Sequence, residues 1–140
     1  MEQYEHLQRE KNIKKEFNRL KNIYKKFTPD KLPAIEELIR NAAFMKVMLE
    51  EFRETLIKHG TTELFKQGKQ EITIERLESK QYLPYIQRYT VVMKDLIGLL
   101  PPSEAKKQED ELTKFVNRKK ERKKQWHILK SIITRLCLVK

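Results

Sequence analysis

The chain has 140 residues, enough for one domain, and combines 36% charged residues with 39% hydrophobic residues and a net charge of +11. Cys137 is the only cysteine, so a disulfide-stapled scaffold is excluded, and the composition favours elongated helices over a large globular core. The longest apolar tract, near residues 128–139, is interrupted by Lys130 and Arg135 and is too short for a spanning helix, so we expect a protein of the cytoplasm.

The positive charge is concentrated at the two ends of the chain. Residues 1–31 hold nine basic and five acidic residues, and residues 114–140 hold ten and one, whereas residues 32–113 hold twelve and fourteen. Basic ends beside a near-neutral middle indicate a polyanionic partner, with nucleic acid as the first candidate and an acidic membrane surface as the second.

Residues 3–27 are predicted to form one amphipathic helix, because Ile13, Phe17, Leu20, Tyr24 and Phe27 recur at helical spacing. Its basic residues are candidate DNA contacts, with a merely solvated face as the alternative: Lys14, Lys15, Arg19, Lys21, Lys25 and Lys26. Thr28-Pro29-Asp30 ends this helix, and Thr28 or Asp30 is expected to cap the next one, with Pro33 in its first turn.

Residues 31–59 are predicted to form a long second helix that ends at Gly60. An unbroken heptad spacing runs along it, through Ile35, Leu38, Ala42, Met45, Leu49, Phe52 and Leu56. Such a stripe requires a partner helix along its whole length.

Residues 61–78 interrupt the helical pattern. Glu71–Glu75 alternates polar and β-branched apolar residues, and Leu64 and Phe65 precede Gly68, so a small β-hairpin or an ordered loop is expected. A third helix is predicted over 79–100, and a fourth from 104 to about 120. Ser79 or a neighbour is the expected cap of the third helix, Pro84 is expected in its first turn, Pro101-Pro102 ends it, and Ser103 is the expected cap of the fourth.

The sequence therefore predicts a mainly α protein with an N-terminal basic helix (1–31), a long antiparallel helical hairpin (32–101) and a C-terminal helical, basic tail (102–140). The apolar stripes are expected to lie between subunits, and a self-contained three-helix core is the alternative. The residues expected at the subunit contact are Ile35, Leu38, Ala42, Met45, Leu49, Phe52, Tyr85, Tyr89, Met93 and Leu96.

The C-terminal tail has two features of its own. Its basic run is a second candidate DNA contact, with a disordered solubilising tail as the alternative: Arg118, Lys119, Lys120, Arg122, Lys123 and Lys124. The apolar residues Trp126, Leu129, Ile133 and Leu136 share one face of a possible short helix, which could dock in the groove of a partner protein or lie on an acidic membrane.

Catalytic signatures are missing from the sequence. His6, His59 and His127 are scattered and the single cysteine completes no tetrahedral metal site, while Gly68-Lys69 lacks the remaining residues of a phosphate-binding loop. We therefore expect neither an enzyme nor a metal or other cofactor.

Three segments resemble the small terminase subunits of tailed phages and prophages of Gram-positive bacteria. They are KKEFNRLKNIYKKF (14–27), LIRNAAFMKVMLEEFRETLIKHG (38–60) followed by TELFKQG, and YIQRYTVVMKDLIGLLP (85–101) followed by DELTKFVNRK (110–119). The resemblance implies a helical homo-oligomer, commonly a ring, in the cytoplasm of the bacterial host. Such a protein recognises viral double-stranded DNA for packaging and recruits and regulates the large terminase subunit, which carries the ATPase and nuclease.

Two departures from that family affect the expectation. Only about 30 residues precede the long helix, so there is no room for the compact helix-turn-helix domain with which many small terminases begin, and the tail after residue 119 is unlike the family pattern. The alternative reading is a coiled-coil interaction protein whose basic amphipathic tail binds a membrane surface or a partner groove.

Overall fold

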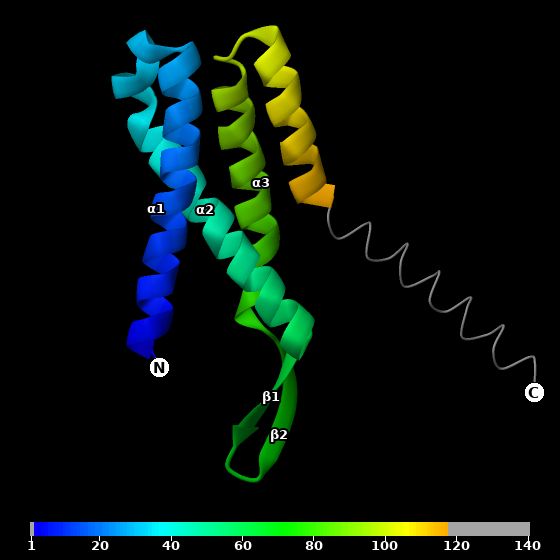
Figure 1. The fold of residues 1–140 in the computed structure, drawn as a ribbon. Coiled ribbons are helices and arrows are strands. Elements are labelled where there is room, and N and C mark those ends of the chain that lie inside the picture. The colour runs from blue at the N-terminus through cyan, green and yellow to red at the C-terminus, as the bar shows by residue number, and fades with distance from the viewer. Residues whose placement is uncertain (1, 118–140) are drawn as a thin grey trace, which may run out of the picture.

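The computed structural model describes residues 2–117, which are mainly helical with one small antiparallel sheet. In chain order the elements are α1 (Glu2–Phe27), a 3₁₀ turn (Pro29–Lys31), α2 (Leu32–His59), β1 (Thr62–Gln67), β2 (Gln70–Glu75), α3 (Leu77–Ile97) and a fourth helix over residues 102–117. The helices run up, down, up and down beside one another, and the β-hairpin extends from the lower end of α2 and α3 (Figure 1). The predicted antiparallel pairing of the second and third helices is confirmed, and of the two alternatives for the segment between them the small antiparallel β-hairpin is present.

The hydrophobic core lies where the four helices meet. It joins Leu20 and Tyr24 of α1, Ile39, Ala42 and Leu49 of α2, Tyr89, Met93 and Leu96 of α3, and Leu112 and Phe115 of the fourth helix. The rings of Tyr89 and Phe115 meet edge to face with centroids 5.4 Å apart. Each large apolar side chain buried in this way contributes about 1.5–3 kcal/mol of transfer free energy.

Packing within one chain accounts for much of the predicted apolar stripe. Ala42, Leu49, Tyr89, Met93 and Leu96 are at most 3% exposed inside the single chain. Four of the other predicted contact residues are half-buried against the same core: Ile35, Leu38, Met45 and Tyr85. Phe52 is also half-buried, and its ring meets that of Tyr85 edge to face with centroids 5.3 Å apart. The self-contained core is thus sufficient to explain the buried part of the stripe, and a role for these residues between subunits stays a prediction.

Several helix boundaries differ from those predicted. Thr28 does not cap α2, because its hydroxyl donates back to the Tyr24 carbonyl at 3.3 Å, and Asp30 lies inside the 3₁₀ turn. Helix α3 begins directly after β2, so Pro84 lies in the helix interior, and the Ser79 hydroxyl bonds to the Glu75 carboxylate at 2.9 Å instead of capping. Ser103 also lies inside its helix, which starts at residue 102.

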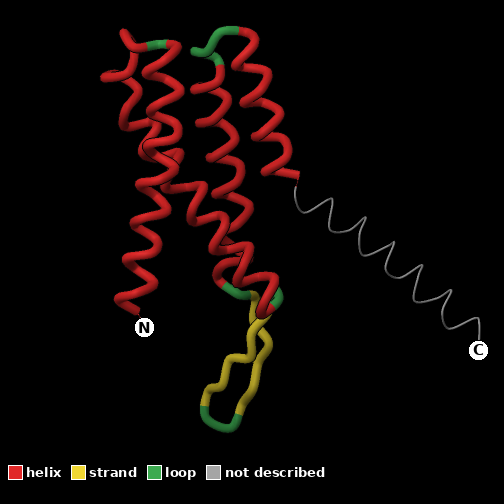
Figure 2. Tube along the Cα trace, viewed as in Figure 1, coloured by secondary structure: helices red, strands yellow, loops and turns green. Residues whose placement is uncertain are grey.

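The β-hairpin closes through the two-residue turn Gly68-Lys69 (Figure 2). Gly68 has a φ of 61°, the left-handed value that the first central residue of a type II′ hairpin turn requires. The register places Phe65 opposite Ile72, and both side chains are about half exposed (48% and 50%). The centre of one face of the hairpin is therefore apolar, and within residues 2–117 it is only about half covered.

Candidate nucleic-acid interface

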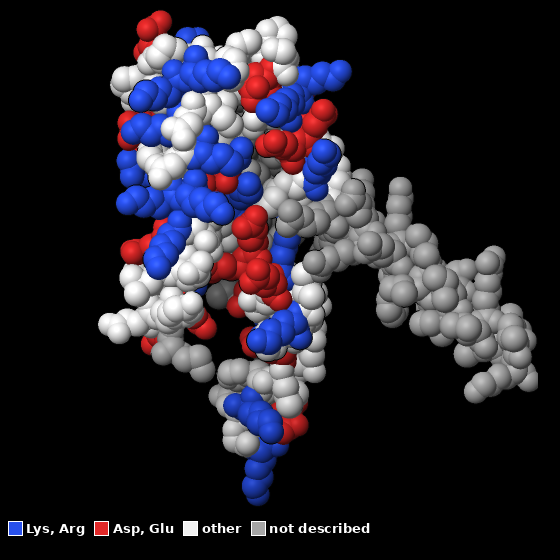
Figure 3. Space-filling model, in the orientation of Figure 1, with Lys and Arg blue, Asp and Glu red and all other residues white. Residues whose placement is uncertain are grey.

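The outer side of α1 carries a row of exposed lysines, which we call the α1 lysine face. The helix buries Leu20 and Tyr24 against the bundle because its apolar residues recur on that side. The opposite side is exposed and holds Lys11, Lys14, Lys15, Lys25 and Lys26. Figure 3 shows basic side chains gathered over the upper part of the molecule, where Figure 1 places the C-terminal half of α1.

Four of these lysines are among the predicted DNA contacts, and Lys11 is not. A signal for Lys11 is present in the sequence, since it precedes Lys14 and Lys15 by three and four residues and so falls on the same helical face. Glu16 is the one acidic residue between positions 11 and 26, and its side chain points toward the other helices. The α1 lysine face therefore carries no acidic side chain over this stretch.

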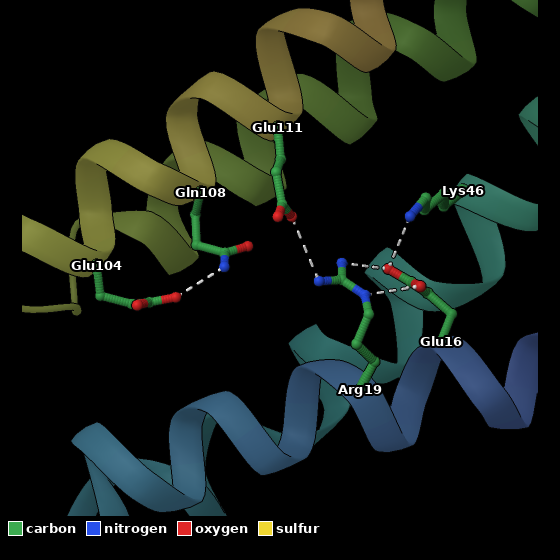
Figure 4. Close-up of polar contacts among 6 residues, drawn as sticks. All are labelled: Glu16, Arg19, Lys46, Glu104, Gln108 and Glu111. Carbon is green, nitrogen blue, oxygen red and sulfur yellow. Dashed lines mark hydrogen bonds and ion pairs between the residues drawn. The ribbon is translucent and has the colours of Figure 1, made fainter.

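Arg19 differs from the exposed lysines because it is held in a cluster of ion pairs (Figure 4). Its Nε and Nη2 donate to the two carboxylate oxygens of Glu16 at 3.0 and 2.6 Å, and its Nη1 lies 3.6 Å from Glu111 of the fourth helix. Lys46 of α2 donates to the same Glu16 carboxylate at 3.2 Å. The cluster links α1, α2 and the fourth helix. The guanidinium of Arg19 is therefore engaged in contacts within the protein.

The ionisation of this cluster follows from its geometry. Burial disfavours the charged form of Glu16, but the hydrogen bonds and positive charges of Arg19 and Lys46 outweigh it and hold the Glu16 pKa below its ordinary value. The hydrogen bond to Glu16 likewise raises the pKa of Arg19. Both groups are therefore fully charged at neutral pH.

Lys21 is also engaged within the protein. Its Nζ lies 3.5 Å from the Glu36 carboxylate of α2 and 5.5 Å from the centre of the Phe17 ring. Arg40 of α2 covers the same ring with its guanidinium 5.0 Å from the ring centre. Of the six predicted basic residues of α1, the structure thus leaves Lys14, Lys15, Lys25 and Lys26 as exposed cations and places Arg19 and Lys21 in ion pairs.

A second surface feature is an open groove of about 560 Å³ between α2 and α3. Phe44 and Val91 on its walls remain 43% and 60% exposed. The groove is lined by Asn41, Phe44, Met45, Tyr85, Gln87, Arg88, Val91 and Val92. The groove and the apolar face of the β-hairpin are two candidate contact surfaces for another protein chain.

The remaining predicted sites lie outside the described residues. These are the basic run Arg118, Lys119, Lys120, Arg122, Lys123 and Lys124 and the docking residues Trp126, Leu129, Ile133 and Leu136. Over residues 2–117, no three His, Cys, Asp or Glu side chains come together as a metal ion would require. In the same range, none of the helices combines the length and apolar character needed to cross a bilayer.

No protein-family model matches the chain, and no curated protein or solved structure matches it either. The resemblance to small terminase subunits therefore stays a prediction from the sequence.

Proposed function

We propose that the chain is a small terminase subunit, which acts in the cytoplasm of the bacterial host as a homo-oligomer, binds viral double-stranded DNA for genome packaging, and recruits and regulates the large terminase subunit. The α1 lysine face supports the DNA-binding part of this proposal. Residues 11–26 hold seven basic residues and one acidic residue, and that acid is turned inward and paired. A helix face of this kind offers ammonium groups to phosphates with no carboxylate nearby to repel them.

Oligomerisation would make this weak contact effective. A single helix with five exposed lysines makes few phosphate contacts, but several copies arranged around one DNA molecule raise the effective affinity without any new chemistry. The DNA-binding and self-association parts of the proposal therefore depend on each other.

The α2–α3 groove and the apolar face of the β-hairpin are the surfaces that a second copy would cover. A two-stranded hairpin is marginally stable in water unless something packs on its face, and Phe65 and Ile72 remain about half exposed within residues 2–117. Residues 61–76 hold three acidic and three basic residues, so this region has no net charge in a chain of +11. Copies can therefore meet here without the repulsion that would separate two lysine faces.

The test of DNA binding uses the full chain and a fluorescent duplex at low and high salt. The variant Lys14→Ala/Lys15→Ala/Lys25→Ala/Lys26→Ala is expected to bind at least tenfold more weakly and to show a shallower salt dependence, by about 0.9 in the slope for each lost phosphate contact. Lys106→Ala/Lys107→Ala, on the exposed side of the fourth helix, is the control for lost positive charge and should bind as the parent does.

Self-association is measured on the same samples by light scattering on a sizing column. The parent should be one large oligomer, and Val91→Lys or Phe65→Lys should reduce its mass, whereas Leu7→Lys, which also places a lysine at an exposed apolar position, should not. A parent chain that is monomeric at micromolar concentration and ignores DNA at modest salt contradicts the proposal. Flotation with anionic vesicles in place of DNA binding would favour the membrane-surface alternative.

A further inference from the structure

The middle of the α1 lysine face is occupied by two asparagines. Asn18 and Asn22 are both exposed, and at about 100° per residue they lie about 40° apart on the helix, directly opposite the buried Leu20 and Tyr24. The lysines surround them on both flanks and toward the N-terminus: Lys14 and Lys25 on one side, Lys15 and Lys26 on the other, and Lys11 in line with the pair.

The packing of residues 2–117 does not engage these asparagines. Within residues 2–117 neither side-chain amide has a hydrogen-bond partner, whereas Asn12 on the same helix accepts a hydrogen bond from Gln8 at 3.4 Å. Asparagine is also a poorer helix former than the lysine, glutamate or alanine that an exposed helix position usually favours. Two unpaired amides one turn apart at the centre of a basic face are therefore available to a ligand.

We propose that α1 enters the major groove of double-stranded DNA and that Asn18 and Asn22 read the edges of two adenines while the flanking lysines hold the phosphates. The inference rests on the proposed function and specifies how that site recognises its DNA. An asparagine amide is complementary to the adenine edge in the major groove, because its oxygen accepts from N6 and its nitrogen donates to N7. Lysine contacts to phosphate, in contrast, position the protein and carry no sequence information.

The dimensions of the face fit this arrangement. A major groove about 12 Å wide admits one α-helix, and lysines on the two flanks of that helix point toward the two phosphate backbones that border the groove. Asn18 and Asn22 are separated by about 6 Å along the helix axis, which corresponds to about two base-pair steps of 3.4 Å. The recognised adenines should therefore lie about two base pairs apart.

The experiment selects bound duplexes from a random pool with the full-length oligomer. The parent should enrich adenines at two positions about two base pairs apart, and Asn18→Ala/Asn22→Ala should lose this enrichment while its affinity for the unselected pool changes less than twofold. Asn12→Ala is the matched control, because it removes an exposed asparagine of the same helix that lies outside the lysine face. Alanine favours the helix, so folding should be preserved, and light scattering checks that the oligomer is unchanged.

A second measurement replaces the selected adenines with 7-deazaadenine, which removes N7. The parent should lose about fivefold to 100-fold in affinity for each base, and Asn18→Ala/Asn22→Ala should be indifferent to the replacement. Salt-dependent DNA binding without adenine enrichment, or enrichment that survives in the double variant, overturns the inference and leaves the proposed function in place. Failure of the parent to bind any duplex overturns both.

Discussion

The ion-pair cluster around Glu16 makes a specific prediction for the variant Glu16→Gln. The Glu16 side chain is 12% exposed and receives a bidentate contact from Arg19 and a further hydrogen bond from Lys46. Hydrogen bonds to charged groups contribute about 1.5–3 kcal/mol each when buried. The glutamine amide keeps part of this network, and Arg19 and Lys46 retain some contact with water, so we expect a loss of about 2 kcal/mol in the free energy of unfolding at pH 7.

The pH dependence identifies the charge as the cause. Because the Glu16 pKa is lowered in the folded state, the ionised carboxylate stabilises the protein above its ordinary pKa near 4.5, and this contribution is lost as the pH falls through the folded-state pKa. The stability difference between the parent and Glu16→Gln should therefore be full at pH 7 and should shrink below about pH 4.5.

Urea unfolding followed by circular dichroism at a series of pH values measures both effects. Glu37→Gln is the matched control, because that carboxylate is 75% exposed and lies 3.5 Å from the Arg40 guanidinium. We expect the control to change the stability by less than about 0.5 kcal/mol. A stability loss for Glu16→Gln as small as that of the control, or one of equal size at pH 7 and pH 3.5, would refute the conclusion that the ionised Glu16 carboxylate stabilises the contact between these helices.

Three further predictions concern the packing of the helices and use the same unfolding assay. Leu49→Ala removes a fully buried core side chain and should cost about 2–5 kcal/mol, while Ile57→Ala, at a 59% exposed position of the same helix, should cost less than about 0.5 kcal/mol. Arg53 donates hydrogen bonds to the Tyr82 hydroxyl at 2.7 Å and to the Phe115 carbonyl at 2.6 Å. Arg53→Ala removes both and should lower the free energy of unfolding by about 2 kcal/mol. No change in stability would mean that these contacts do not hold the fourth helix. Pro84→Ala restores a backbone donor in the interior of α3 and should raise stability by about 1 kcal/mol or more, and a loss would show that the proline shapes the helix.

The spacing of apolar residues in α1 predicted some exposed cations of this helix correctly and others not. Lys14, Lys15, Lys25 and Lys26 were predictable as exposed cations because the apolar residues of α1 recur at helical spacing and define the opposite, buried side. Arg19 and Lys21 fit the same pattern, but their side chains bond to Glu111 and Glu36 on other helices. No local spacing indicates such partners, because they depend on which helices become neighbours.

The sequence by itself indicated the four helices and their order, and it left a β-hairpin and an ordered loop as alternatives for residues 61–78. Helical periodicity indicated the helices, Gly60 after Lys58 and His59 indicated the end of α2, and the alternation over Glu71–Glu75 favoured a strand. These signals act within a few residues of the chain, so they can be read without knowledge of the fold.

Only the tertiary structure decided how the apolar stripes are used. A heptad spacing requires a partner helix but does not say whether that partner belongs to the same chain, and here Ala42 and Leu49 of α2 are buried in a core formed with the other helices of one chain. The start of α3 also depends on the tertiary structure. The helix begins at Leu77, immediately after the β-hairpin, so Pro84 lies in its interior. The physical reason is that burial depends on contacts between segments far apart in sequence, and the pattern of any one segment specifies only which of its sides is apolar.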